Sequence, residues 1–358
     1  MAKQLLLTGA SGYIGGDVLV ALGRLAAAGA VALTLFVRDA DAVAARVRAD
    51  LGLPAAVVPA GTPVDGIAVV AGTYEDRAVF GAAIRAADIV VHTGDAADSA
   101  AAAAVLAAEL AGWPAGRDLL LIHTSGTAIL VDPAENDRAS SRVWDDVADI
   151  RAITAWPAGR PHGTIDQTIL GIHRTAPGGV RTLVVAPPLV YGRGRGPGNQ
   201  RSQQVPTLIG AVAALGRNAI VGSGRAIWGN VHVQDLSALY ALLVRTYLEA
   251  PHRLAYNADG YYFASAGEHA WRSLTVALDA PLVRHGVVAA DRTSADGTAV
   301  FSAADYRALL DRGTAVLPSF FVTNSRSRAT RARALGWAPT RESLAATLDD
   351  EVRRFVGA

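Results

Sequence analysis

Three glycines at fixed spacing, close to the first residue, restrict the fold more than any other feature of the sequence. Residues 8–15 read TGASGYIG and lie between an apolar run at 4–7 and a helical pattern at about 14–27. In a strand–turn–helix unit such glycines allow a tight turn, a close approach of a pyrophosphate to the backbone, and close helix packing. The free N–H groups of the helix N-terminus favour the same anion. We therefore expect a dinucleotide to bind at this turn.

Apolar runs and helical patterns alternate along the first half of the chain. We expect strands at 4–7, 31–37, 67–71, 89–92, 119–123 and 182–186, and helices at about 14–27, 39–51, 75–86 and 99–110. Continuous apolar runs are typical of parallel strands buried on both faces, and the helices between them imply right-handed crossovers. The pattern predicts an α/β fold with a doubly wound parallel sheet, a Rossmann fold.

The second half is less regular. A Gly/Arg/Pro segment at 192–198 is typical of a solvated loop. Aromatic residues at 228, 261–263 and 271 either line a substrate pocket or fill the core. We expect a cofactor-binding Rossmann domain over residues 1–190 and a smaller substrate-covering region over 191–358, from which segments return to the Rossmann domain.

Composition excludes several classes of protein. The net charge of +1 gives no electrostatic argument for nucleic acid or an anionic membrane as a partner. The sequence has no cysteine, which excludes disulfides, thiolate catalysis and Cys-ligated zinc. No apolar stretch reaches the roughly 18 residues of a membrane span, and no histidine pair has metal-ligand spacing. We expect a cytoplasmic monomer or homodimer that binds a small-molecule substrate and no metal.

The tip of the second expected strand bears on the choice of cofactor. An acidic residue at this position binds the ribose 2′-hydroxyl of NAD, whereas an arginine accommodates the 2′-phosphate of NADP. The segment reads Phe36-Val37-Arg38-Asp39, so Arg38 is at the tip and Asp39 follows in a helix-capping position. The sequence therefore predicts NADP(H); a solvated surface role for Arg38 is the alternative.

Six motifs in the expected order resemble the short-chain dehydrogenase/reductase superfamily, in its extended or atypical, NAD(P)-dependent epimerase/dehydratase-like branches. They are TGASGYIG (8–15), GTYED (72–76), HTSGT (123–127), PPLVYG (187–192), NVHVQD (230–235) and LGWAP (335–339). The resemblance implies a catalytic serine at Ser125 and a proline-containing loop beside the nicotinamide. The cofactor contacts that we expect are Gly9, Ser11, Gly12, Tyr13, Ile14, Gly15, Arg38, Thr93, Pro187 and Val190.

One departure from the family pattern affects the expected chemistry. The family uses a Tyr-x-x-x-Lys pair on a helix, and the matching place here reads His162-Gly163-Thr164-Ile165-Asp166. Lys3 is the only lysine and belongs to the first strand, so no lysine elsewhere can serve a displaced pair. Atypical members without the pair include enzymes and redox-sensing regulators similar to NmrA-like proteins.

The altered centre allows two interpretations. On a helix, His162 and Asp166 share a face, so the carboxylate can orient the imidazole and raise its pKa. A histidine that titrates near neutrality can donate a proton to a carbonyl that receives hydride, with Ser125 bonded to the same oxygen. Alternatively the pair is only structural and the activity is lost. Ser125, His162 and Asp166 are also residue types of a hydrolase triad, but no G-x-S-x-G elbow surrounds Ser125.

The leading hypothesis is an NADP(H)-dependent oxidoreductase that reduces a small carbonyl compound or oxidises the alcohol. Its catalytic residues would be Ser125, His162 and Asp166. The alternatives are a cofactor-binding, redox-sensing regulator without turnover, and a non-redox isomerase or lyase on the same fold.

Overall fold

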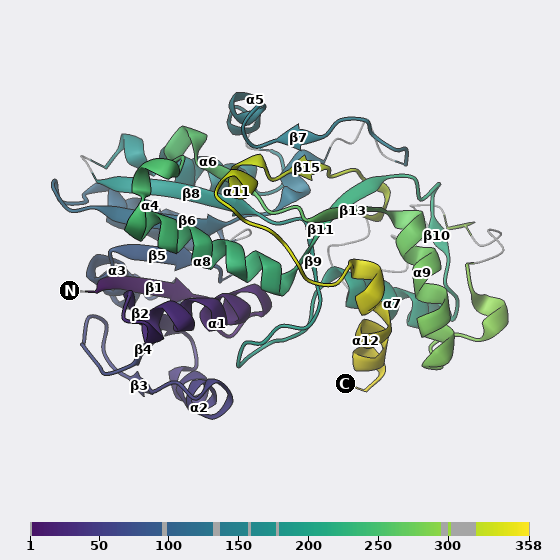
Figure 1. The fold of residues 1–358 in the computed structure, drawn as a ribbon, viewed down its shortest axis with the longest axis horizontal. Helices are drawn as coiled ribbons and strands as arrows, with labels where there is room; N and C mark the ends of the chain where they lie inside the picture. The colour runs from purple at the N-terminus through teal and green to yellow at the C-terminus, as the bar shows by residue number, and fades with distance from the viewer. Residues whose placement is uncertain are drawn as a thin grey trace.

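A parallel sheet of eight strands forms the centre of the larger part of the molecule (Figure 1). The computed structural model describes residues 2–94, 99–131, 137–156, 159–176, 179–294, 300–301 and 320–357. Across the sheet the order is β12-β8-β6-β5-β1-β2-β4-β3. The strands are β1 (Lys3–Thr8), β2 (Val31–Val37), β3 (Ala55–Val57), β4 (Ile67–Ala71), β5 (Ile89–His92), β6 (Leu119–Thr124), β8 (Val180–Ala186) and β12 (Tyr261–Phe263). The expected doubly wound Rossmann fold is confirmed.

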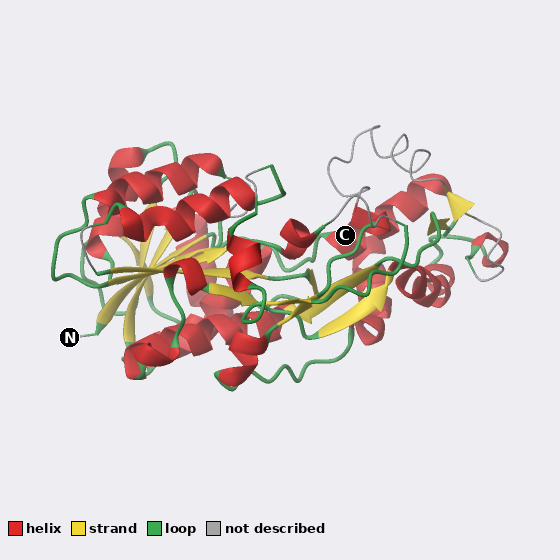
Figure 2. Ribbon diagram, turned by 90° about the horizontal axis from the view of Figure 1, so that it is seen from above, coloured by secondary structure: helices red, strands yellow, loops and turns green. Residues whose placement is uncertain are grey.

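Helices cover both faces of this sheet (Figure 2). On one side α4 packs between α3 and α6, and on the other α1 packs against α8. The helices are α1 (Tyr13–Ala27), α2 (Ala40–Leu51), α3 (Arg77–Ala86), α4 (Ala100–Ala111), α6 (Gly163–Gly171) and α8 (Val233–Glu249). Asp39 caps α2 as its position predicts, because its carboxylate accepts the N–H of Ala42 at 3.0 Å.

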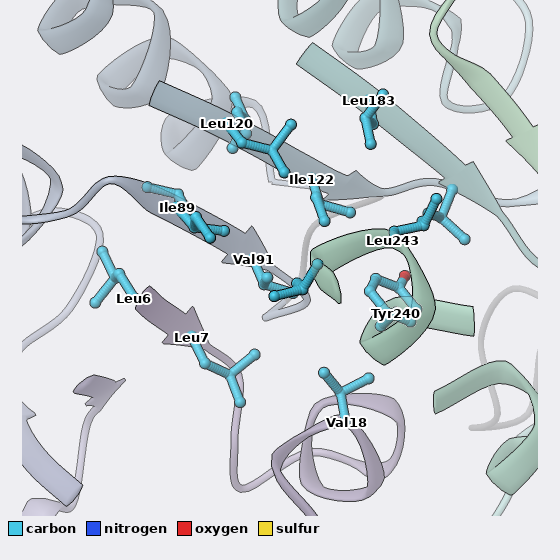
Figure 3. Close-up of a cluster of buried hydrophobic side chains, with 14 of the residues drawn as sticks. Leu6, Leu7, Val18, Ile89, Val91, Leu120, Ile122, Leu183, Tyr240 and Leu243 are labelled. Carbon is cyan, nitrogen blue, oxygen red and sulfur yellow. The ribbon is translucent and has the colours of Figure 1, made fainter. Parts of the chain in front are cut away.

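The main core lies between the sheet and the pair α1 and α8. Figure 3 shows strand side chains such as Leu7, Val91 and Ile122 facing Val18 of α1 and Tyr240 of α8. These side chains are at most 1% exposed, so the core leaves no solvent-accessible gap at this interface. The carboxyl ends of β1, β5 and β6 are therefore held rigidly beside one another.

A smaller region builds a second core from later segments. Its sheet joins β11 (Ile227–His232) in parallel to β9 (Leu189–Tyr191) and antiparallel to β13 (Gly267–Ala270). Three helices pack around this sheet: α7 (Gln204–Leu215), α9 (Trp271–Arg284) and α12 (Leu344–Val356). In the described ranges the other α-helices and strands are short: α5 (Ile150–Thr154), α11 (Thr330–Ala334), the pair β7 (Trp144–Asp145) with β15 (Ser327–Arg328), and the pair β10 (Ile220–Val221) with β14 (Val300–Phe301).

Two strands of the main sheet were not expected from the sequence. β3 is a three-residue edge strand, and β12 returns to the sheet as the neighbour of β8. The aromatic run at 261–263 therefore belongs to the core, as do Trp228 and Trp271, each 3% exposed. Within the described ranges, no helix combines the length and the apolar character needed to cross a membrane.

Candidate functional site

A cavity of about 920 Å³ lies over the turn between β1 and α1. Every turn residue expected to contact the cofactor lines it, together with Arg38 and Thr93. Pro187 and Val190 do not line it: the Pro187 carbonyl accepts the N–H of Thr127 at 2.9 Å, and Val190 belongs to β9. The lining residues are Gly9, Ser11, Gly12, Tyr13, Ile14, Gly15, Phe36, Val37, Arg38, Gly72, Thr73, Tyr74, Glu75, Thr93, Gly94, Asn199, Arg201, Ser202 and Gln203.

The three glycines of the turn have different roles. Gly9 has a φ of +76°, and a Cβ there would lie 2.4 Å from Gly94, so this position requires glycine. A Cβ at Gly15 would lie 2.2 Å from the Gly9 carbonyl oxygen, which allows α1 to pack closely. At Gly12 a Cβ would have that same oxygen, at 3.2 Å, as its one non-adjacent neighbour within 4 Å among the described residues. Gly12 therefore leaves its side open to the cavity, where a pyrophosphate can approach the uncapped N-terminus of α1.

The opposite wall of the cavity comes from the loop at 192–203. Asn199 donates its N–H to the Ser11 carbonyl at 2.9 Å, so the loop lies directly on the glycine turn. Arg195 fixes the loop to α1: its Nη2 lies 2.6 Å from Oδ1 of Asp17, and its backbone N–H donates to Oδ2 at 2.9 Å. Asp17 is fully buried and also accepts the Ser237 hydroxyl at 2.5 Å. The loop is thus a fixed wall, which corrects the expectation of a solvated loop.

Arg38 and Glu75 both line the end of the cavity that β2 and β4 form. The pKa of Glu75 is lowered by a backbone hydrogen bond at Glu75 itself, then by one from Thr73, with a contribution from the positive charge of Arg38. Phe36 and Tyr74 stack with ring centroids 6.2 Å apart and line the same end. This end therefore combines two aromatic rings with one basic and one acidic side chain.

The side chains of Ser125 and Asp166 are joined by a hydrogen bond. The Ser125 hydroxyl donates to Oδ2 of Asp166 at 2.7 Å, and the Tyr261 hydroxyl donates to the same oxygen at 2.7 Å. Ser125 follows β6, Asp166 lies on α6 and Tyr261 belongs to β12, and all three are at most 4% exposed. Sequence reasoning did not place Tyr261 here, because β12 joins the sheet far from the other two residues in sequence.

Burial destabilises the ionised form of the Asp166 carboxyl group. Burial raises its pKa to about 6, against the lowering effect of hydrogen bonds from Ser125 and Tyr261 and of the charge of His162. Its Oδ1 lies 3.9 Å from Nε2 of His123 and accepts no hydrogen bond from the described part of the chain. Asp166 is therefore a group whose protonation changes within reach of neutral pH.

Comparisons with known proteins agree with this geometry. No family model matches the chain. An Acremonium protein named oxidase ucsJ is 29% identical over 368 residues, which cover 99% of this chain and 98% of that protein. The dTDP-glucose 4,6-dehydratase DesIV from Streptomyces venezuelae, solved with NAD bound, gives a TM-score of 0.61 at 18% identity over 98% of this chain and 96% of that one. The human epimerase family protein SDR39U1, solved with NADPH, gives 0.55 at 16% identity over 98% and 99%.

The chain has the extended short-chain dehydrogenase/reductase fold. The resemblance read from the sequence motifs is confirmed at this level. Of the proteins named above, two have the names of enzymes, an oxidase and a dehydratase, and the two solved structures hold NAD or NADPH.

His162 is the residue that we expect in place of the family's tyrosine, and this match stays a prediction. It lies immediately before α6 with a φ of +63°, and not within the helix as its spacing to Asp166 suggested. A Cβ at Gly126 would lie 2.9 Å from Nε2 of His162, so the imidazole lies against the residue after Ser125. The hydrogen bonds of the Asp166 carboxylate go to Ser125 and Tyr261, and His162 acts on it through charge.

Two further histidines of this fold are completely buried behind the site. Nδ1 of His92 lies 2.7 Å from the Thr8 hydroxyl, and the rings of His92 and His123 stack with centroids 5.5 Å apart. Burial lowers the pKa of His92 to about 4, and that of His123 falls for the same reason, so both are neutral at pH 7. His232 is a core residue, 4% exposed, that accepts the N–H of Gln234. Over the described residues, no three acidic or histidine side chains are grouped to hold a metal.

Proposed function

We propose that this protein is an NADP(H)-dependent oxidoreductase that reduces a small carbonyl compound or oxidises the corresponding alcohol. The proposal rests on one observation: the nucleotide cavity and the Ser125 hydroxyl lie at the ends of two adjacent strands, β5 and β6. Thr93 and Gly94 follow β5 and line the nucleotide cavity, while Ser125 follows the neighbouring strand β6 with its hydroxyl bonded to a buried carboxylate. This is where an open α/β sheet binds ligands.

The residues of the cavity fit a dinucleotide. The open side of Gly12 and the N-terminus of α1 would hold the pyrophosphate, and the rings of Phe36 and Tyr74 would cover the adenine. When bound, the nicotinamide supplies or accepts a hydride. Arg201 adds a second positive charge to the same cavity, on the wall that the 192–203 loop builds.

Arg38 supports NADP(H) in preference to NAD(H). A charge-assisted hydrogen bond to the 2′-phosphate contributes roughly 1.5–3 kcal/mol, or about 10- to 150-fold in affinity. Glu75 opposes this preference, because its carboxylate lies close enough to Arg38 for their charges to interact. The balance between these two side chains would set the selectivity for the cofactor.

Calorimetric titration with NADPH and NADH tests the choice of cofactor. We expect the wild type to bind NADPH more tightly, and Arg38→Ala to weaken NADPH while leaving NADH nearly unchanged. Glu75→Gln should strengthen NADPH. Arg24→Ala is the matched control, since Arg24 is an exposed arginine of α1 that does not line the cavity. Equal affinities of the wild type for both nucleotides would contradict the role of Arg38.

The catalytic group is proposed to act by proton transfer. Nε2 of protonated His162 would supply the proton to the oxygen of the substrate carbonyl. The Ser125 hydroxyl donates its single proton to Asp166 in this structure, so it would have to turn toward the substrate to donate to the same oxygen. No tyrosine–lysine pair is needed in this arrangement.

Oxidation of NADPH across a panel of small aldehydes and ketones tests turnover, followed by the absorbance of the reduced nicotinamide. Turnover that requires Ser125 would support the proposal. Tight NADPH binding without turnover on the whole panel would instead favour a cofactor-binding regulator.

A further inference from the structure

A second, smaller pocket lies outside the nucleotide cavity. Its volume is about 70 Å³, and three of its lining side chains are arginines while none is acidic. Pockets that enclose a whole small ligand are roughly 300–1,000 Å³, so this one admits a single functional group. The lining residues are Leu130, Ser140, Arg142, Trp144, Arg160, Asn324 and Arg326.

Arg160 is held rigidly but keeps donors for a ligand. Its guanidinium lies 4.4 Å from the ring centroid of Trp156, and Nη1 donates to the carbonyls of Ile129 at 3.0 Å and Val131 at 2.9 Å. A guanidinium has five N–H donors, and among the described residues Nε and Nη2 have no hydrogen-bond partner. Within the ranges that the structure describes, no carboxylate lies at ion-pair distance from Arg160.

The other two arginines are already paired. Arg142 lies 4.1 Å from the ring centroid of Trp144 and bonds to Asp149 at 2.6 Å. Arg326 makes a two-pronged contact with Glu268 at 3.0 and 2.8 Å. Among the residues that the structure describes, two carboxylates therefore balance two of the three guanidiniums, and the surplus is the one positive charge of Arg160.

Two chain segments connect the lining of this pocket to the candidate catalytic group. The segment at 160–162 runs beside the segment at 126–131: the imidazole of His162 lies against Gly126, and Arg160 bonds to the carbonyls of Ile129 and Val131. The Arg160 carbonyl accepts the N–H of Gly163 at 3.0 Å, which fixes the turn that carries His162. A group bound by Arg160 is thus held by the same two segments that position His162 beside Ser125.

We propose that this pocket binds a singly charged carboxylate of the substrate, so that the substrate class is a carbonyl or hydroxy compound that carries a carboxylate. The proposal rests on the proposed function. Planar guanidiniums recognise carboxylate and phosphate groups through paired N–H donors. The surplus of one charge and the volume of one functional group favour a carboxylate over a phosphate.

Tryptophan fluorescence tests binding without any need for turnover. Trp144 and Trp156 lie beside the pocket arginines, whereas the other four of the six tryptophans are at most 4% exposed. The probes are acetate, inorganic phosphate and neutral acetamide, titrated at matched ionic strength with NADP⁺ present to keep anions out of the nucleotide cavity. We expect saturable binding of acetate, weaker binding of phosphate and no binding of acetamide.

Substitutions of two pocket arginines test whether acetate binds in this pocket. Arg160→Gln should weaken acetate binding about tenfold or more, the loss expected for a charge-assisted hydrogen bond. Arg160 also donates hydrogen bonds to the carbonyls of Ile129 and Val131, so its loss can affect the fold. Arg142→Gln is therefore the second variant. The Arg142 side chain is 49% exposed, so this substitution should weaken acetate binding without affecting the fold. Arg174→Gln is the control, on an exposed arginine outside the pocket. Circular dichroism checks that each variant is folded.

Each outcome decides one claim. Acetate binding that is unaffected by both pocket variants, or that acetamide reproduces, overturns the site. Phosphate binding without acetate binding overturns the carboxylate assignment. Turnover of carbonyl compounds with no preference for carboxylates overturns this inference but leaves the proposed function standing. Loss of acetate binding in Arg160→Gln, in a protein that turns over nothing, supports the site and contradicts the proposed function.

Discussion

Asp166→Asn is expected to stabilise the folded protein at neutral pH, although it removes a carboxylate that accepts two hydrogen bonds. Asparagine presents a carbonyl oxygen of the same shape, which can still accept from Ser125 and Tyr261. What it removes is the cost of an ionised group that is 2% exposed and has one oxygen without a hydrogen bond. The substitution therefore separates the cost of the charge from the benefit of the hydrogen bonds.

The magnitude follows from the pKa of Asp166. In the unfolded chain this carboxyl titrates at its ordinary value of 3.8, and burial raises the pKa in the folded protein to about 6. That difference corresponds to about 3 kcal/mol in the free energy of unfolding. Because the folded-state pKa is raised, the contribution of Asp166 to stability is greatest below pH 3.8 and is lost as the pH rises to about 6. The advantage of Asn over Asp should grow across this window and stay constant above it.

Urea unfolding at a series of pH values, followed by tryptophan fluorescence, measures the difference. The midpoints of wild type and Asp166→Asn should coincide near pH 4 and separate as the pH rises, with equal m-values. Asp259→Asn, at an exposed aspartate, is the control for the loss of one charge and should show no such separation. A variant less stable than wild type at pH 8, or a difference independent of pH, would refute the reasoning.

Three further substitutions test the cavity, the catalytic group and the loop. Gly12→Val should abolish binding of NADPH in calorimetry while the protein stays folded, since its side chain would fill the approach to α1 and not the core; tight binding by the folded variant would place the nucleotide elsewhere. His162→Ala should leave NADPH affinity nearly intact and reduce turnover roughly 10²–10⁴-fold; an unchanged rate would exclude His162 as the donor. Arg195→Ala should destabilise the protein by about 3 kcal/mol in urea unfolding, because it leaves the buried Asp17 carboxylate without its cation. Arg193→Ala is the control for the last, on an exposed arginine of the same loop, and a cost equal to that of Arg195→Ala would contradict the role of the ion pair.

The sequence predicts those parts of the fold that depend on local patterns. The turn between β1 and α1 and the bounds of β2 follow from glycine spacing and from a continuous apolar run. β3 could not be predicted, because Ala55, Ala56 and Val57 are too few and too small to give a strand signal. β12 follows Gly260 and has a strand-favouring composition, but only its pairing with β8 places it in the main sheet.

The candidate site was predictable to a smaller extent. The spacing of His162 and Asp166 assumes that both lie on one helix, whereas the left-handed backbone of His162 places it before the helix begins. The Asp166 carboxylate is consequently bonded to Ser125 and to Tyr261. The contact with Tyr261 joins two segments that are 95 residues apart. The periodicity of residues within a short stretch of sequence cannot predict a contact between segments so far apart, so only the folded structure can show it.

The loop at 192–203 affects the order in which the protein can be assembled. On the ribosome the glycine turn is synthesised well before the wall that faces it, from Asn199 to Gln203. Asp17 likewise meets Arg195 and Ser237 only after most of the sheet has been synthesised. N-terminal segments generally fold first during synthesis. Here, however, α1 carries the buried carboxylate of Asp17, and the residues that bind this carboxylate are synthesised long after the helix. Nucleotide binding should therefore begin only after the 192–203 loop has been synthesised, and a chain interrupted before the loop would expose an unpaired carboxylate that quality-control proteases can act on.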